Sequence, residues 1–98
     1  MRTAIVLMLC LATGFPGVLA QSGPKTLDIY YIDTEGGQST LFVSPTGESL
    51  LVDTGNASDR DLTRIVETLE AAGLSRIDRM WTTHYHGDHV GALMALAT

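Results

Sequence analysis

The alternation of apolar and polar positions along the chain predicts a strand-rich domain with one long helix. Runs rich in β-branched and aromatic residues predict strands near 26–32, 39–44, 48–53 and 79–83, and a further helix is expected to start near 89–97. In the first strand Leu27, Ile29 and Tyr31 share one face, because side chains alternate along a strand. The turn Pro45-Thr46-Gly47 joins the second and third strands as a hairpin. Trp81 is expected in the core or in a pocket wall.

Between the third and fourth strands, apolar residues recur at i, i+3, i+4 and i+7, which predicts a helix near 59–72. The residues of this stripe are Leu62, Ile65, Val66 and Leu69. Ser58 suits the N-cap, Asp59 and Asp61 follow in the first turn, and Gly73 suits the position just after the end. The other charged side chains are expected to form the solvated face of the helix: Arg60, Arg64, Glu67 and Glu70.

The first twenty residues have the pattern of a secretory leader. Arg2 gives a positive start, residues 4–12 form an unbroken apolar run, and Val18-Leu19-Ala20 suits cleavage before Gln21. A membrane anchor is the alternative, but the run is well short of the ~20 apolar residues that a spanning helix needs. The pattern therefore predicts a signal peptide over residues 1–20 and a secreted or periplasmic protein, with no membrane partner after cleavage.

Length, cysteine content and net charge limit the size of the protein, its crosslinks and its partners. The chain has 98 residues, of which 45% are hydrophobic, and this suffices for one small domain. The single cysteine, Cys10, lies in the expected leader, so no disulfide would staple the mature chain. Removing Arg2 from six basic and eleven acidic residues leaves a net charge of −6. No nucleic-acid patch is evident, and this charge gives no reason to expect binding to an anionic membrane.

All three histidines of the chain are interleaved with a carboxylate in one short stretch, whose spacing is H-x-H-x-D-H: His84, Tyr85, His86, Gly87, Asp88 and His89. The two histidines of H-x-H, at the end of a strand, leave the backbone on the same side. Gly87 then lets the chain turn, so Asp88 and His89 return toward the same point. Imidazole and carboxylate are donors that Zn²⁺ prefers. The four side chains are therefore predicted to converge, on more than one ion.

This stretch resembles the metal-binding motif of the metallo-β-lactamase superfamily, which follows a short apolar strand. The resemblance covers residues 26–97 and implies an α/β fold, the αββα metallo-β-lactamase sandwich, of which the chain matches the N-terminal half. It implies two Zn²⁺ ions, or other divalent metals, with His84 and His86 on the first ion and Asp88 and His89 on the second. Asp88 would also be the catalytic residue that orients the attacking water and passes a proton to the leaving group.

Asp53-Thr54-Gly55 resembles a second recurrent motif of that family, in which the aspartate supports the metal loop by hydrogen bonds. A plain turn-capping role for Asp53 is the alternative. The same triplet, after an apolar run, also resembles the signature of aspartic proteases, in which two such aspartates from two lobes or subunits share a proton. The helical pattern that follows disfavours a dimeric protease of this kind, and the histidine cluster would go unexplained in it.

We therefore expect a secreted metal-dependent hydrolase acting on a small-molecule or phosphodiester substrate, with β-lactam, thioester and phosphodiester hydrolysis all open. Family members supply further histidine and aspartate ligands downstream, whereas here no histidine follows His89 and no aspartate follows Asp88. Residues 21–98 are accordingly expected to be the N-terminal part of a truncated domain, inactive alone. A non-catalytic metal-binding fragment is the alternative.

Overall fold

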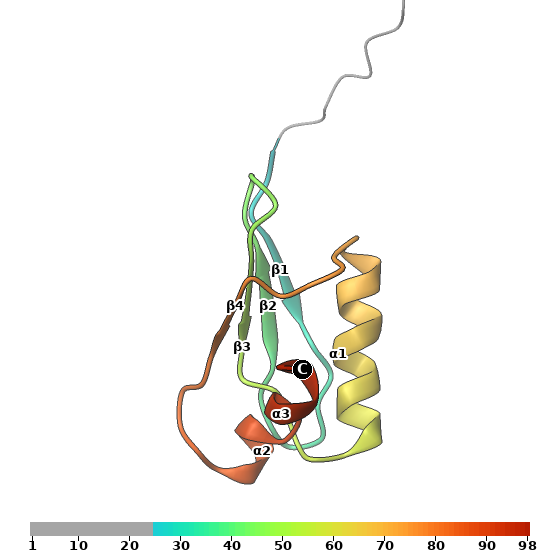
Figure 1. The fold of residues 1–98 in the computed structure, drawn as a ribbon, viewed down its shortest axis with the longest axis vertical. Coiled ribbons are helices and arrows are strands. Elements are labelled where there is room, and N and C mark those ends of the chain that lie inside the picture. The colour runs from blue at the N-terminus through green and yellow to red at the C-terminus, as the bar shows by residue number, and fades with distance from the viewer. Residues whose placement is uncertain (1–24) are drawn as a thin grey trace, which may run out of the picture.

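A four-stranded sheet with a helix along one face forms the body of the protein in a computed structural model, which describes residues 25–98 (Figure 1). The elements in chain order are β1 (Asp28–Tyr31), β2 (Thr40–Val43), β3 (Ser49–Val52), α1 (Asp59–Ala71), β4 (Arg79–Trp81), α2 (Gly87–Val90) and α3 (Leu93–Leu96). The predicted signal peptide over residues 1–20 lies outside the described residues. Among those described, no helix is long and apolar enough to cross a membrane.

The sheet has the order β1-β2-β3-β4, and its strands follow one another in space as they do in sequence. β1, β2 and β3 pair antiparallel, and α1 then carries the chain back so that β4 pairs parallel to β3. The predicted hairpin is confirmed: Gly47, at φ 90°, donates its N–H to the Ser44 carbonyl. Of the expected sandwich, the described residues contain one sheet and its covering helix.

The core lies between this sheet and α1. Leu41 pairs with Leu51 and Leu51 with Met80, so these residues form one row on the same face of the sheet. Leu41, Leu51 and Ile65 of α1 are fully buried. The helix ends as the sequence predicts, because the Ser58 side chain accepts the Asp61 N–H and Gly73 adopts φ 72° just beyond Ala72. The stripe of apolar residues on α1 is therefore what fixes the helix to the sheet.

The opposite face of the sheet overturns one prediction. Trp81 was expected in the core or in a pocket wall, and the core position is wrong, because its side chain is 65% exposed. It pairs with Val52, which pairs with Thr40 and so with Tyr31, and this row points away from α1. Along β1 and the residues that flank it, the exposed face carries Leu27, Ile29 and Tyr31, while Tyr30 and Ile32 pack against the core.

The chain is helical where a further helix was expected to start, near 89–97, but the helix is interrupted. Two short helices form instead, because the N–H groups of Gly91 and Ala92 donate to the carbonyls of Gly55 and Thr54. The fourth strand ends at Trp81 rather than at residue 83, since the Thr83 N–H donates to a side-chain oxygen of Asp53. At Thr83 and at Gly91, hydrogen bonds to residues 53–55, the segment after β3, therefore take the place of strand and helix hydrogen bonds.

At the other end of the sheet, Ser49 and Asp78 hold the beginnings of β3 and β4 together. The Ser49 N–H donates to Oδ2 of Asp78 at 2.8 Å, and the Asp78 N–H donates to Oγ of Ser49 at 2.9 Å. Hydrogen bonds donated by the Ser49 N–H and the Ser49 hydroxyl hold the pKa of the Asp78 carboxyl below its ordinary value. The Ser49–Asp78 hydrogen bonds thus form a clamp between the beginnings of the parallel strands β3 and β4, and the histidine-rich stretch follows the opposite end of β4.

Candidate metal centre

The histidine-rich stretch occupies the loop after β4 and the first turn of α2, at the carboxyl ends of the parallel strands β3 and β4. Residues 82–91 are called the metal loop below. His84 is the common neighbour of the other two histidines. Its ring centroid lies 4.8 Å from that of His86 and 3.9 Å from that of His89. Oδ2 of Asp88 lies 3.7 Å from Nε2 of His89. All four residues predicted as metal ligands are therefore neighbours in space.

Asp53, the residue directly after β3, lies beneath this cluster and is 1% exposed. Its backbone has φ 59°, a left-handed conformation that aspartate tolerates better than most residues. Oδ1 accepts the Thr83 N–H at 2.8 Å, and Oδ2 accepts the Thr83 hydroxyl at 2.7 Å. Oδ2 also lies 2.8 Å from Nδ1 of His89. Both carboxylate oxygens are thus committed to the metal loop.

The charge of Asp53 is favoured by these contacts. Burial by itself raises the pKa of this carboxyl, but hydrogen bonds from His89 and from the Thr83 amide and hydroxyl outweigh it, and the pKa lies below its ordinary value. An ionised carboxylate only accepts hydrogen bonds, so Nδ1 of His89 carries the proton. In the neutral imidazole the lone pair of His89 is then on Nε2, which lies 3.7 Å from Oδ2 of Asp88.

Backbone hydrogen bonds attach the metal loop to two other loops. The Gln38 N–H donates to the Asp88 carbonyl, the Thr54 N–H to the His89 carbonyl, and the Gly91 N–H to the Gly55 carbonyl. The approach at Gly91 is so close that an added Cβ would lie 1.9 Å from the carbonyl carbon of Asn56. Only glycine fits there, and the position of α2 is therefore fixed by backbone contacts as well as by Asp53.

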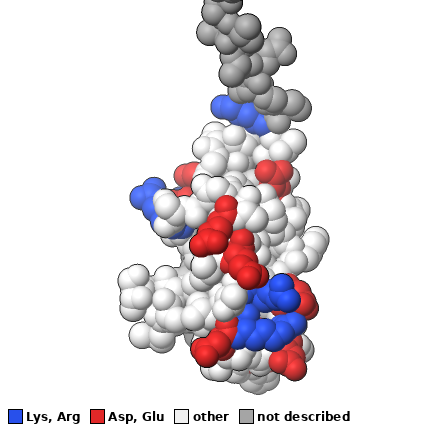
Figure 2. All heavy atoms as spheres, turned by 90° about the vertical axis from the view of Figure 1, so that its right-hand side faces the viewer, with Lys and Arg blue, Asp and Glu red and all other residues white. Residues whose placement is uncertain are grey.

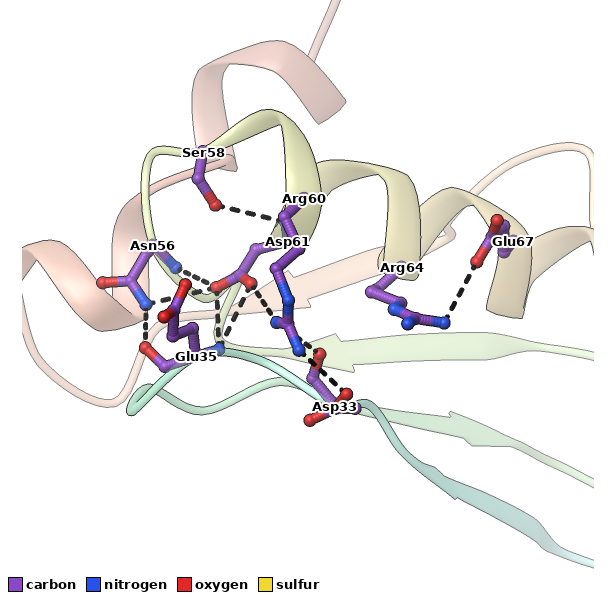
Figure 3. A network of polar contacts seen from close by, with 8 residues as sticks. All are labelled: Asp33, Glu35, Asn56, Ser58, Arg60, Asp61, Arg64 and Glu67. Atoms are coloured by element: carbon purple, nitrogen blue, oxygen red, sulfur yellow. Dashed lines mark hydrogen bonds and ion pairs between the residues drawn. The ribbon is translucent and has the colours of Figure 1, made fainter.

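A second buried carboxylate, Asp61, holds the loops behind the site (Figure 3). Its oxygens accept the N–H groups of Glu35 and Asn56, the side-chain amide of Asn56, and Nη1 of Arg60 at 3.0 Å. Burial alone raises the pKa of Asp61, but these bonds outweigh it and hold the pKa below its ordinary value. The sequence gives no sign of this role, because an acid in the first turn of a helix already has a local explanation.

Arg60 lies on the solvated face of α1, as expected, and it has a further role there. Its side chain is about two-fifths exposed, but its guanidinium bridges Oδ2 of Asp33 at 2.9 Å and the buried Asp61. Arg64 and Glu67 also lie on the outer face of the helix, where Nη1 of Arg64 is 3.7 Å from Oε2 of Glu67. Figure 2 shows basic and acidic side chains interspersed on the side of the molecule along which α1 lies.

The donor set fits a borderline metal ion in its chemistry, since three imidazoles and a carboxylate are gathered on one loop with His89 already oriented by Asp53. Within residues 25–98, no group of three His, Cys, Asp or Glu side chains is placed so that it could hold a metal ion. The chemistry of the donors thus suits a metal ion, but their arrangement is not that of a metal site.

Fold and loop together define a mixed α/β protein with a histidine- and aspartate-bearing loop at the carboxyl end of a parallel strand pair. The sequence profile of the metallo-beta-lactamase superfamily matches residues 33–98, and the chain belongs to that superfamily. Its members commonly bind metal ions. No curated protein and no solved structure matches the chain.

Proposed function

We propose that the protein is a secreted, zinc-dependent hydrolase in which His84, His86, Asp88 and His89 hold the metal. The observation that carries the proposal is the clustering of the three histidine rings on a loop where Asp53 orients His89. A histidine whose second ring nitrogen is held by a carboxylate is the arrangement that metal sites use to fix the ligand's tautomer and direction. Superfamily membership supports the same assignment.

Zinc, when bound, acidifies a water molecule and polarises the scissile carbonyl or phosphoryl group. The residues of this chain supply the rest. Asp53 keeps the proton of His89 on Nδ1, so that Nε2 presents its lone pair. Asp88 is about two-fifths exposed beside that nitrogen, where its carboxylate can accept a proton from the attacking water and return it to the leaving group.

The contacts of Asp53 disfavour the aspartic protease alternative. Its oxygens are occupied by Thr83 and His89, and the side chain is buried beneath the loop rather than open to substrate. The chain then continues into α1. A catalytic aspartate of such a protease must share a proton with a second aspartate and reach a water molecule. Asp53 is placed to support a neighbouring histidine instead.

Zinc binding by the purified chain, measured by competition with a chromophoric chelator, tests the ligand assignment. We expect His84→Ala and His89→Ala to weaken binding by at least about tenfold, because each removes an imidazole donor. Tyr85→Phe is the matched control, since Tyr85 lies between the ligands and is 87% exposed. Equal affinity in all four proteins would rule the loop out as a metal site.

The hydrolase assignment is tested in the full-length gene product. Hydrolysis of β-lactam, thioester and phosphodiester reporters should cease on chelation and return with Zn²⁺, and the reporter that is turned over identifies the substrate class. Activity that survives chelation but disappears in Asp53→Asn would support the protease alternative. Zinc binding without turnover of any of the three reporters would contradict the hydrolase assignment and leave a metal-binding protein.

A further inference from the structure

The buried carboxylate of Asp61 makes contacts that a helix cap does not need. The Ser58 side chain already caps α1 by accepting the Asp61 N–H. The Asp61 side chain, fully buried, instead reaches the loops that follow β1 and β3, where it accepts the N–H groups of Glu35 and Asn56. All of its partners are donors, so only the ionised form of Asp61 satisfies them. The carboxylate thus acts between segments rather than within its helix.

One peptide group connects Asp61 to the metal loop. The N–H of the Gly55–Asn56 peptide donates to Oδ2 of Asp61 at 2.8 Å, and the carbonyl of the same peptide accepts the Gly91 N–H at 2.8 Å. Gly91 follows His89 by two residues. A peptide whose N–H binds a carboxylate is polarised, and its carbonyl becomes a stronger acceptor. The buried charge therefore strengthens the bond that holds the end of α2.

Close packing makes this connection stiff. A Cβ at Gly55 would lie 2.8 Å from Oδ2 of Asp61, and a Cβ at Gly91 would lie 1.9 Å from the carbonyl carbon of Asn56. The carboxylate thus packs on Gly55, and Gly91 packs on the adjoining Asn56–Ala57 peptide, with no space for a side chain at either glycine. A displacement of the backbone from Gly55 to Ala57 is therefore transmitted to Gly91, through its hydrogen bond to the Gly55 carbonyl and through this packing.

A second connection runs through the loop after β1. Asp61 accepts the Glu35 N–H, and three residues further on the Gln38 N–H donates to the Asp88 carbonyl. Gly37 lies directly against that carbonyl, since a Cβ there would approach the Asp88 oxygen to 2.2 Å. Asp88 and His89 are therefore held from both sides by loops that share Asp61 as their anchor.

We propose that Asp61 is a positioning residue for the metal loop, acting through the Gly55–Asn56 peptide on Gly91 and through the loop after β1 on Asp88. The inference rests on the proposed function for its effect on zinc, but the positioning itself is a property of the metal-free protein. Asp61 touches none of the candidate ligands, yet on this proposal it helps to set the positions of two of them, Asp88 and His89.

Two variants of Asp61 test this, each with a matched control. Asp61→Asn keeps the shape but loses the charge and places an amide donor among the donors of Glu35 and Asn56. Asp61→Ala removes the side chain and covers the case in which the asparagine finds new partners. Asp59→Asn removes the same charge from the exposed face of the same helical turn. Asp78→Ala breaks the carboxylate clamp at the opposite end of the sheet and so controls for a general loss of stability.

Native-state hydrogen exchange of the metal-free chain is the first measurement. In both Asp61 variants we expect the amides of Gln38, Thr54 and Gly91 to lose protection by roughly tenfold or more, beyond what global unfolding accounts for. In Asp78→Ala these amides should follow global unfolding alone, and in Asp59→Asn they should match the wild type. Unchanged protection relative to global stability in the Asp61 variants would overturn the proposal.

Zinc affinity is the second measurement. We expect a loss of about 10–100-fold in the Asp61 variants, the scale found for residues that orient ligands, and wild-type affinity in Asp59→Asn. A loss as large in Asp78→Ala at equal stability would reduce Asp61 to an ordinary stabilising residue. If the wild-type chain itself binds no zinc, the proposed function fails, and the exchange data still decide whether Asp61 positions the loop.

Discussion

Asp53 and His89 lie 36 residues apart in the chain, and a carboxylate oxygen of the first lies 2.8 Å from Nδ1 of the second. The contact depends on the parallel pairing of β3 with β4, which brings the segments after these strands to the same edge of the sheet. It also depends on the left-handed backbone of Asp53, which turns the side chain under the loop. A conformationally costly residue is thus retained where it fixes the proton on a candidate metal ligand.

Replacing Asp53 with asparagine isolates the role of its charge, because asparagine also tolerates a left-handed backbone. We expect Asp53→Asn to weaken zinc binding by about 10–100-fold, since the amide holds His89 less firmly and offers an N–H group toward the donors of Thr83. The measurement is a chelator competition titration. An unchanged titration would leave Asp53 as a turn residue.

Two glycines of the metal loop should differ sharply in their tolerance of a methyl group. A Cβ at Gly91 meets the Asn56 carbonyl carbon at 1.9 Å, whereas a Cβ at Gly87 meets nothing within 4 Å. We expect Gly91→Ala to lower the free energy of unfolding by at least about 2 kcal/mol, and Gly87→Ala to change it by about 0.5 kcal/mol or less. Denaturant unfolding compares them, and equal values would show that the loop adapts freely.

Stability should fall in acid below about pH 4. The pKa values of Asp53 and Asp61 lie below their ordinary value in the folded protein, where hydrogen bonds favour the ionised form. The unfolded chain takes up protons first, near pH ~3.9, so the stabilisation is complete above that pH and is lost as the pH falls through the lower, folded values. Unfolding free energies measured between pH 6 and pH 3 should show this fall. The unfolding free energy of Asp61→Asn should fall less over this pH range. An equal fall would show that Asp61 does not contribute to the loss of stability in acid.

The exposure of Trp81 makes a prediction about the sheet. Leu51 is fully buried in the row facing α1, while Trp81 lies in the row on the opposite face. Leu51→Ala should therefore cost about 2–5 kcal/mol, and Trp81→Ser about 0.5 kcal/mol or less. Thermal unfolding of both variants is the measurement. A large loss for Trp81→Ser would mean that this face is covered in solution.

Local sequence patterns were sufficient for most of the fold. Periodicity located the four strands and α1, and Ser58 and Gly73 marked the ends of that helix, because these features depend on neighbouring residues. The spacing of the histidines likewise indicated that they gather. What the patterns did not indicate depends on residues far apart. Which face of the sheet is covered decides the exposure of Trp81, and the Gly55 carbonyl accepts the Gly91 N–H where the last helix is interrupted.

The candidate site shows the same division. The resemblance of Asp53-Thr54-Gly55 to a family motif indicated a supporting aspartate, and the structure places Asp53 against His89. Asp61 gave no comparable signal, because an acid after a serine N-cap has an adequate local explanation in the helix dipole. Its partners Glu35 and Asn56 come from two other loops, and neither forms a spacing pattern with it that sequence alone reveals.

The connection from β3 to β4 also sets an order of assembly. β1, β2 and β3 pair through short loops, whereas β4 reaches β3 only after the whole of α1, a closure that is slower because its contacts are distant in sequence. His89 meets Asp53 after that closure. We expect pulse-labelled refolding to protect β2 before Thr83 and Gly91, and simultaneous protection would contradict this order. The histidines then form a potential metal site only at the last step of folding. An ion bound there would therefore stabilise only those molecules in which folding is complete.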